Sequence, residues 1–259
     1  MDELERFARG RAAAIGSYEQ DTAFQTHSLA WVLEAMSKRY VYNFDWLGRP
    51  IIQYPQDLQA MQEIVWQTRP DVIIETGIAH GGSLIFSASM LALLDYADAA
   101  AAGRPLVPGQ SDRKVIGIDI DIRAHNRPLI EKHPLAGLIM MYEGSSVDPD
   151  ISKQVREAIP EGARVMVCLD SHHEEAHVLA ELDTYATLVS PGCYCVVLDT
   201  FIEDAPAGFI ADRPWDVGNN PKTAVHKWLP ANPGFEIDRQ LARKLMITGA
   251  PDGYLKRLE

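Results

Sequence analysis

The sequence predicts a doubly wound α/β fold, in which helices cover both faces of a mostly parallel sheet. Five short apolar runs recur along the chain, and unbroken apolar runs are typical of strands buried on both faces of a parallel sheet. Stretches of helical composition separate the runs, so strands and helices alternate. The runs cover residues 72–74, 115–118, 138–141, 165–169 and 193–198.

Helices are predicted before, between and after these strands. Residues 1–40 have helical character, a loop rich in aromatic residues, Gly and Pro follows over 42–57, and Pro55 starts a helix near residues 56–68. The remaining predictions are helices near 83–95, 123–132, 148–158, 174–189 and 221–229, and strands near 235–240 and 244–248. We expect a helical extension and lid over 1–55 and one domain over 56–259.

Composition excludes several classes of protein. With 259 residues, 47% of them hydrophobic and 23% charged, the chain can bury a full core and is not disordered. Its net charge of −12 repels phosphate backbones, so we expect no nucleic-acid partner. The N-terminus lacks a signal-peptide core and no apolar run is long enough to span a membrane. The three cysteines suit a reducing compartment, so we expect a cytoplasmic protein.

The predicted strands end in polar residues. The carboxyl ends of parallel strands form the ligand-binding edge of an open sheet. A strand also ends wherever polar residues begin, so each residue taken alone is ambiguous. Five such ends at one edge, together with nearby glycines, favour a ligand site. These residues are Glu75, Asp119, Ser145, Asp170 and Asp199.

A glycine-rich turn, ETGIAHGGS, follows the first strand over residues 75–83. Glycines between a strand and a helix let the backbone approach a ligand closely, although a tight turn without ligand is the structural alternative. The spacing matches neither the dinucleotide fingerprint nor the P-loop. Glu75 suits a cationic group, such as the amino group of S-adenosylmethionine. Asp119 is placed to accept hydrogen bonds from two ribose hydroxyls.

Asp170 and Asp199 end neighbouring strands and could share a Mg²⁺ ion, because hard cations prefer oxygen ligands. His173 lies three residues after Asp170 and could take a proton beside that ion. The structural alternative is that Asp170 caps the helix beginning near Glu174, with the histidine on the surface.

The sequence resembles the cephalosporin hydroxylase / rhamnosyl O-methyltransferase family of S-adenosylmethionine-dependent enzymes. The matching segments occur in order between about residues 40 and 258. They are WLGRPIIQYPQD (46–57), PDVIIETGIAHGGSLIFSASML (70–91), KVIGIDID (114–121), LDSHH (169–173), VVLDT (196–200), NPKTAVHKWL (220–229) and PDGYLKRL (251–258).

The resemblance implies a Rossmann-like class I methyltransferase fold. Its seven-stranded sheet would be mostly parallel, with an antiparallel last strand that fits the run at 244–248, and with extra N-terminal helices. S-adenosylmethionine would lie on the turn over 75–83. Cofactor-binding residues are expected at Glu75, Thr76, Gly77, Gly81, Gly82, Ser83, Asp119, Gly144, Ser145 and Asp170.

The resemblance also implies a Mg²⁺ site and a catalytic base. Asp170 and Asp199 would be metal ligands, and His173 would act as general base with Asp170 beside it. The family pattern has Glu-Asp after the fifth strand, whereas this chain has Leu198-Asp199. Glu203, Asp204 or water could supply the missing oxygen, or the protein does not use the metal.

The function implied is methylation of a sugar hydroxyl on a glycosylated natural product, such as an antibiotic, or on a polysaccharide, by a homo-oligomeric enzyme. Acceptor contacts are expected at Tyr54, Trp215, Asp216 and Asn219, although the tyrosine and the tryptophan could equally be packing anchors. Three alternatives remain open: methylation of a catechol-like phenol, an accessory protein that binds S-adenosylmethionine without catalysis, and a hydroxylase or methoxylation component. The last would need a redox centre that the sequence does not show.

Overall fold

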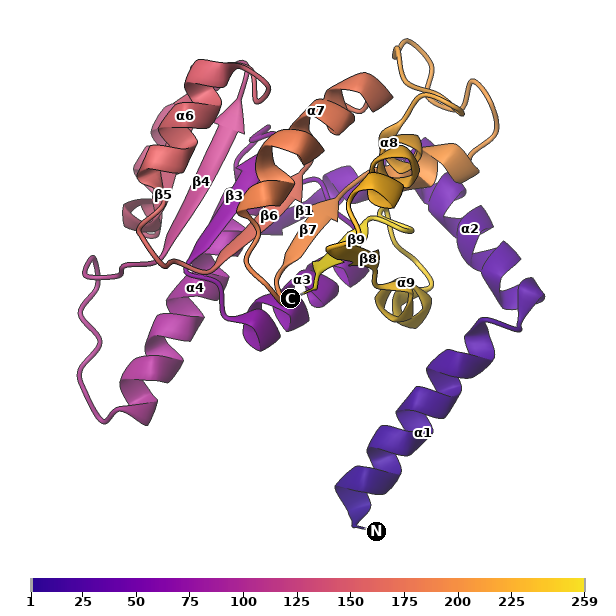
Figure 1. Cartoon of the computed structure of the whole chain (residues 1–259), viewed down its shortest axis with the longest axis horizontal. Coiled ribbons are helices and arrows are strands. Elements are labelled where there is room, and N and C mark those ends of the chain that lie inside the picture. Colours follow the sequence, from indigo (N-terminus) through magenta and orange to yellow (C-terminus); the bar gives the residue numbers. More distant parts are fainter. Residues whose placement is uncertain (1, 259) are drawn as a thin grey trace.

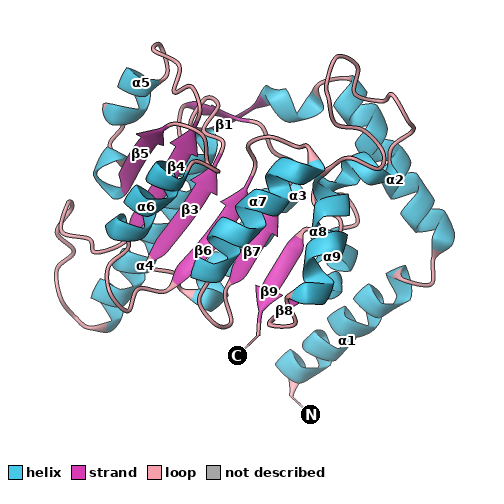
Figure 2. Cartoon of the chain, turned by 45° about the horizontal axis from the view of Figure 1, so that its top comes forward, coloured by secondary structure: helices cyan, strands magenta, loops and turns pink. Residues whose placement is uncertain are grey.

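The computed structural model describes residues 2–258 and has a central seven-stranded sheet between two layers of helices (Figures 1 and 2). The strand order is β5-β4-β3-β6-β7-β9-β8, and β9 runs antiparallel to both of its neighbours. This confirms the predicted mostly parallel sheet. The strands are β3 Val72–Thr76, β4 Lys114–Asp119, β5 Ile139–Glu143, β6 Val165–Leu169, β7 Tyr194–Val197, β8 Phe235–Ile237 and β9 Tyr254–Arg257.

Alternate residues of each parallel strand enter two separate apolar cores, because successive side chains point to opposite faces. Ile73 and Met166 pack on the layer of α3, α4, α5 and α9, whereas Ile74 and Val167 pack on α6, α7 and α8. The helices are α3 Pro55–Thr68, α4 Gly82–Ala101, α5 Arg127–Glu131, α6 Pro149–Ala158, α7 Glu175–Tyr185, α8 Pro221–Trp228 and α9 Arg239–Leu245. Short 3₁₀ turns cover Tyr40–Asn43, Ala136–Leu138, Ala186–Leu188, Thr200–Asp204 and Leu229–Ala231.

Within the described residues, α4 is the one helix whose length and apolar composition would allow it to cross a membrane. More than half of that apolar segment is buried in this structure, where Leu84, Leu91 and Leu94 lie in the core beneath the sheet. The helix is therefore accounted for by the packing of the α/β fold.

The predicted strand at 244–248 is wrong. Residues up to Leu245 belong to α9, which begins after Asp238, whose side chain accepts a hydrogen bond from the Leu241 amide. Leu241 and Leu245 lie four residues apart and pack on the core, as expected on one face of a helix. A short apolar run does not distinguish a strand from a helix by itself. The antiparallel last strand is β9, ten residues further on.

The N-terminal region adds two helices and a hairpin to this sheet. Helices α1 (Glu3–Tyr18) and α2 (Thr22–Ser37) agree with the predicted helical character. The predicted loop contains an antiparallel hairpin, β1 (Phe44–Trp46) and β2 (Arg49–Ile51). Both residues of its two-residue turn have positive φ, which suits a tight hairpin. In Figure 1, α1 extends away from the body of the protein.

Asp57 connects α3 to β9 and to the segment before it through hydrogen bonds. Its carboxylate accepts hydrogen bonds from the Thr248 hydroxyl, the Gly249 amide (2.8 Å) and the Tyr254 hydroxyl (2.8 Å). The side chain is fully buried, and this desolvation raises the pKa of Asp57 to about 6 despite the three donors. A carboxylate with a raised pKa stabilises the fold while it is protonated.

We expect the stability contribution of Asp57 to fall as the pH rises. It is fully present below the ordinary pKa of 3.8 and is lost as the pH passes about 6. This difference corresponds to on the order of 3 kcal/mol of unfolding free energy. Urea unfolding of wild type and Asp57→Asn between about pH 3.5 and pH 7 should therefore show a pH-dependent gap of this size. An equal pH dependence in both proteins would contradict the expectation.

Candidate active site

A pocket lies at the carboxyl ends of β3 and β6, where the sequence predicted a ligand site. Side chains from the β2–α3 connection, α3, α4 and the two strand ends converge on it. Of the predicted site residues, Glu75, Thr76, Gly77, Ser83 and Asp170 line it. The full lining is Gln53, Asp57, Leu58, Met61, Glu75, Thr76, Gly77, Ser83, Phe86, Ser87, Cys168, Asp170 and Leu198.

Three carboxyl groups and no lysine or arginine line this pocket. Glu75 is 5% exposed and accepts a hydrogen bond from the Ser87 hydroxyl, and burial raises the pKa of Glu75. Burial also raises the pKa of Asp170 well above its ordinary value, and the charges of Asp199 and Glu75 raise it further. Carboxylates held this way gain from a nearby positive charge. The pocket therefore suits a cationic ligand.

Two glycines of the turn are required by contacts inside the protein. A Cβ atom at Gly77 would lie 2.1 Å from the backbone oxygen of Asp170. A Cβ atom at Gly82 would lie 2.2 Å from the backbone oxygen of Pro50. Gly81 has a φ of +83° and lies just before α4. Packing between the turn, β6 and the hairpin thus explains these two glycines without a ligand.

Arg49 of the hairpin forms hydrogen bonds that hold the glycine-rich turn. The sequence analysis did not single out this residue. Its guanidinium donates to the carbonyl oxygen of His80 (3.0 Å from Nε) and to Oδ1 of Asn126 (2.9 Å). Asn126 in turn donates to the carbonyl of Ala79 (2.9 Å). Both side chains are buried. An arginine directly after a turn in an otherwise apolar segment is the sequence signal for this role.

Asp119 is tied to the same turn. Its Oδ2 accepts hydrogen bonds from the amides of Ile78 (2.7 Å) and Ala79 (3.2 Å). The amide of Gly144, after β5, donates to the backbone oxygen of Asp119 (2.8 Å), so the two predicted residues are neighbours. Ile120 is 75% exposed, which is unusual for a large apolar side chain beside a polar site. Its exposure could not be read from the sequence.

Asp170, His173 and Asp199 form a cluster next to the pocket. Each offers one ligand atom, and these atoms lie within 4.8 Å of one another. His173 Nε2 is 3.1 Å from Asp199 Oδ2, and Gln53 Nε2 donates to Asp170 Oδ2 at 3.0 Å. Two carboxylates and one imidazole can bind a divalent cation. The residues present therefore fit a metal ion, with one nitrogen in the set.

Leu198, Glu203 and Asp204 add no further oxygen ligand to this cluster. Leu198 packs against the core and lines the pocket with apolar atoms. Glu203 accepts hydrogen bonds from the Gly218 amide (2.7 Å) and the Asn220 side chain, and Asp204 pairs with Lys222 at 2.8 Å. The expectation that either acidic residue replaces the missing ligand is therefore not met in this structure.

His173 lies between the carboxylate of Asp199 and the ring of Trp215. Its ring lies 4.9 Å from the Trp215 ring in an edge-on arrangement, and its side chain is 15% exposed. Burial lowers the pKa of His173 below 6.5, so the imidazole is neutral at pH 7 and can accept a proton. His172 pairs with Glu174 instead. Glu174, not Asp170, is the N-cap residue of α7, so capping does not explain Asp170.

The four residues predicted to contact the acceptor substrate make packing contacts or hydrogen bonds within the protein. Tyr54 is 3% exposed and its hydroxyl donates to the Val32 carbonyl, and Trp215 is 8% exposed in the same apolar cluster. The carboxylate of Asp216 accepts from the amides of Gly208 and Val217. Asn219 Oδ1 accepts from the amide of Glu175. The structure favours the packing interpretation for the tyrosine and the tryptophan.

The family model described as rhamnosyl O-methyltransferase/CmcI matches residues 38–258 of the chain. The rhamnosyl O-methyltransferase of Mycobacterium tuberculosis strain H37Rv is 28% identical over 240 residues, covering 87% of this chain and 85% of the relative. That of Mycobacterium leprae is 28% identical over 235 residues, covering 87% and 90%.

Solved structures agree with this assignment at the level of the fold. A CmcI structure with Mg and SAM has a TM-score of 0.53 at 19% identity, covering 84% of this chain and 78% of that one. An O-methyltransferase from Bacillus cereus in complex with SAH has a TM-score of 0.51 at 16% identity, covering 81% of each chain. The chain therefore belongs to the rhamnosyl O-methyltransferase/CmcI family of S-adenosylmethionine-dependent O-methyltransferases.

Proposed function

We propose that the protein transfers the methyl group of S-adenosylmethionine to a hydroxyl of a sugar carried by a natural product or polysaccharide. The observation that carries this proposal is the contact between two features: the pocket lined by Glu75 and Asp170, and the cluster of Asp170, His173 and Asp199. Asp170 belongs to both. The names of the curated relatives support a rhamnosyl group as acceptor.

In this proposal the cofactor lies across the ends of β3, β4 and β5. Glu75 and Asp170 stabilise the amino and sulfonium charges, because carboxylates in a desolvated pocket favour a cation. Asp119 accepts hydrogen bonds from the ribose hydroxyls with lone pairs that the backbone amides leave free. The exposed Ile120 gives the adenine ring an apolar face. Gly144 and Ser145 follow β5 at the same edge.

His173 is proposed as the base that removes the proton of the attacking hydroxyl. It is neutral at pH 7, and Asp199, 3.1 Å from its Nε2, stabilises the imidazolium that forms. A sugar hydroxyl is a poor nucleophile at this pH, so the site must align it with the methyl–sulfonium bond. Alignment contributes roughly 7–11 kcal/mol and a positioned base about 10²–10⁴-fold.

Asp170 and Asp199 would hold a Mg²⁺ ion, with His173 beside it. The ion would orient two adjacent sugar hydroxyls and make the reacting one more acidic. Leu198 offers no oxygen, so the carboxylates of this chain provide fewer ligands than the family pattern does. The same feature favours the second candidate, an accessory protein that binds the cofactor without methyl transfer. A catechol acceptor, with two adjacent hydroxyls, fits the same cluster.

The first test concerns the cofactor. Asp119→Ala should weaken S-adenosylhomocysteine binding about 10–100-fold, because hydrogen bonds to a charged group contribute roughly 1.5–3 kcal/mol. Isothermal titration calorimetry on wild type and variant measures this directly. Asp112→Ala, an exposed aspartate that forms no ion pair among residues 2–258, is the matched control. Failure of wild type to bind would overturn the assignment of the pocket to this cofactor.

The second test concerns the base. His173→Ala should lower kcat about 10²–10⁴-fold with an aryl rhamnoside as acceptor, while S-adenosylhomocysteine affinity stays unchanged. His172→Ala, one residue away and paired with Glu174, should keep its activity. Since burial lowers the pKa of His173, kcat/KM of wild type should decline only below pH 6.5. Binding of the cofactor with no methyl transfer to rhamnosides or catechols would favour the accessory protein.

The third test concerns the metal. Leu198→Glu adds a carboxylate next to Asp199 and should tighten Mg²⁺ binding at least about tenfold, because affinity rises with ligand charge. Calorimetric titration of MgCl₂ into the protein gives the affinity without an activity assay. Leu198→Gln is the size-matched control and should change it less, and thermal melting shows whether each variant folds. Equal Mg²⁺ affinity in wild type and Leu198→Glu would show that a side chain at position 198 does not contribute to metal binding.

A further inference from the structure

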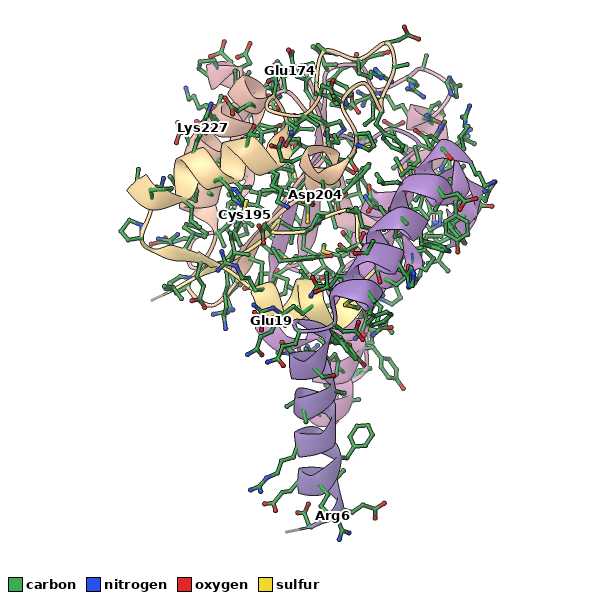
Figure 3. All side chains as sticks on the ribbon, turned by 90° about the vertical axis from the view of Figure 1, so that its right-hand side faces the viewer. Arg6, Glu19, Glu174, Cys195, Asp204 and Lys227 are labelled. Atoms are coloured by element: carbon green, nitrogen blue, oxygen red, sulfur yellow. The ribbon has the colours of Figure 1, made fainter. Side chains whose placement is uncertain are left out.

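Helix α1 has no buried residue, and its first turns carry large apolar side chains. Leu4 is 79% exposed and Phe7 is 68% exposed. Figure 3 shows α1 extending from the body, with Arg6 near its far end and Glu19 where it joins the rest of the chain. A helix of this length is only marginally stable in water by itself. Although α1 contacts α9 and α2, the large apolar side chains of its first turns stay exposed within one chain.

The apolar residues of α1 follow the spacing of a helix that packs on another helix. Leu4, Ala8, Ile15 and Tyr18, with the charged Arg11 between them, are separated by four, three, four and three residues. This alternation places them in one stripe along the helix, as in the seam between two helices of a coiled coil. The family match begins at residue 38, so α1 lies outside the region that the relatives share.

A groove of about 400 Å³ runs beside the C-terminal half of the same stripe, between α1, α3 and α9. Its lining mixes small, apolar and charged side chains. These residues are Ala8, Arg11, Ala12, Ile15, Gly16, Glu63, Gln67, Asp238, Gln240, Leu241, Arg243 and Lys244. Leu4 and Phe7 lie beyond the groove. One helix thus carries a projecting apolar end and, next to its other end, a hollow.

We infer that α1 is a self-association surface, and that the projecting end of α1 from a second copy of this chain occupies the groove. Two antiparallel α1 helices related by a two-fold axis place Leu4 of one opposite Ile15 of the other. The same register places Ala8 opposite Arg11. Because the interface is isologous, every contact occurs twice.

The charges of α1 favour the antiparallel arrangement. Arg11 has no acidic partner within 4 Å among residues 2–258. The first turn carries Glu3 and Glu5, and in the groove Arg243 pairs with Glu19 and Lys244 with Glu63, which leaves Arg11 as the groove's cation outside these pairs. Antiparallel packing brings the acidic turn of one copy to Arg11 of the other. Glu5 lies one turn from Ala8 and is within reach of Arg11 from the partner helix.

The inference is tested on the full-length protein by light scattering after size-exclusion chromatography. Wild type should contain an even number of chains. The double variant Leu4→Asp/Phe7→Asp should have half that mass, because charged residues cannot enter the apolar contact. The matched control is Leu93→Asp/Tyr96→Asp on α4, whose side chains are 55% and 62% exposed, and it should keep the wild-type mass.

A charge exchange distinguishes pairing of α1 from a general loss of structure. Arg11→Glu should shift the assembly toward half-mass species, and Arg11→Glu combined with Glu5→Arg should restore it. Helix content by circular dichroism and S-adenosylhomocysteine binding should be unchanged in all variants, because the substituted residues lie outside the pocket, whereas the melting temperature should fall where the assembly dissociates. A monomeric wild type, an unchanged mass for Leu4→Asp/Phe7→Asp, or the absence of rescue would overturn the inference, and none of these results depends on the proposed methyl transfer.

Discussion

The structure depends on one electrostatic constraint, which is the placement of three poorly solvated carboxyl groups around a single pocket. Asp57, Glu75 and Asp170 all line it, and burial raises the pKa of each. Like charges in a low-dielectric region repel, so each needs hydrogen-bond donors or a cation. Thr248, Gly249 and Tyr254 supply three donors to Asp57, whereas Asp170 has one from Gln53. Asp170 thus has fewer donors than Asp57, and it is the carboxylate in contact with the cluster of His173 and Asp199.

The N-terminal hairpin is part of the site although it lies outside the sheet. Pro50 packs its carbonyl against Gly82, and Arg49 fixes the carbonyl of His80. Gln53, two residues after the end of β2, donates a hydrogen bond to the carboxylate of Asp170. Because these contacts hold the glycine-rich turn, it cannot relax without moving the hairpin. The segment is therefore a structural support of the pocket rather than only a cover over it.

The sequence was sufficient where the signal is local. Unbroken apolar runs located all five parallel strands, and the glycine-rich turn with Asp170 and Asp199 located the edge of the sheet where the pocket and the cluster lie. Long-range contacts were not visible in it. Burial of Tyr54 and Trp215, the roles of Arg49 and Asn126, and the exposure of Ile120 depend on residues far apart in the chain. The prediction of a strand at 244–248 was wrong for another reason, because a short apolar run is compatible with either a helix or a strand.

The position of β9 between β7 and β8 also bears on how the protein is made. Tyr254 donates to Asp57, nearly two hundred residues earlier, and a Cβ at Gly253 would lie 2.0 Å from the Val197 carbonyl. Synthesis proceeds from the N-terminus, and domains fold as units. A nascent chain that has exposed every pocket-lining residue on the ribosome still lacks the strand that completes the sheet. Asp57 therefore receives the Tyr254 hydrogen bond only after residues 253–257 have been synthesised.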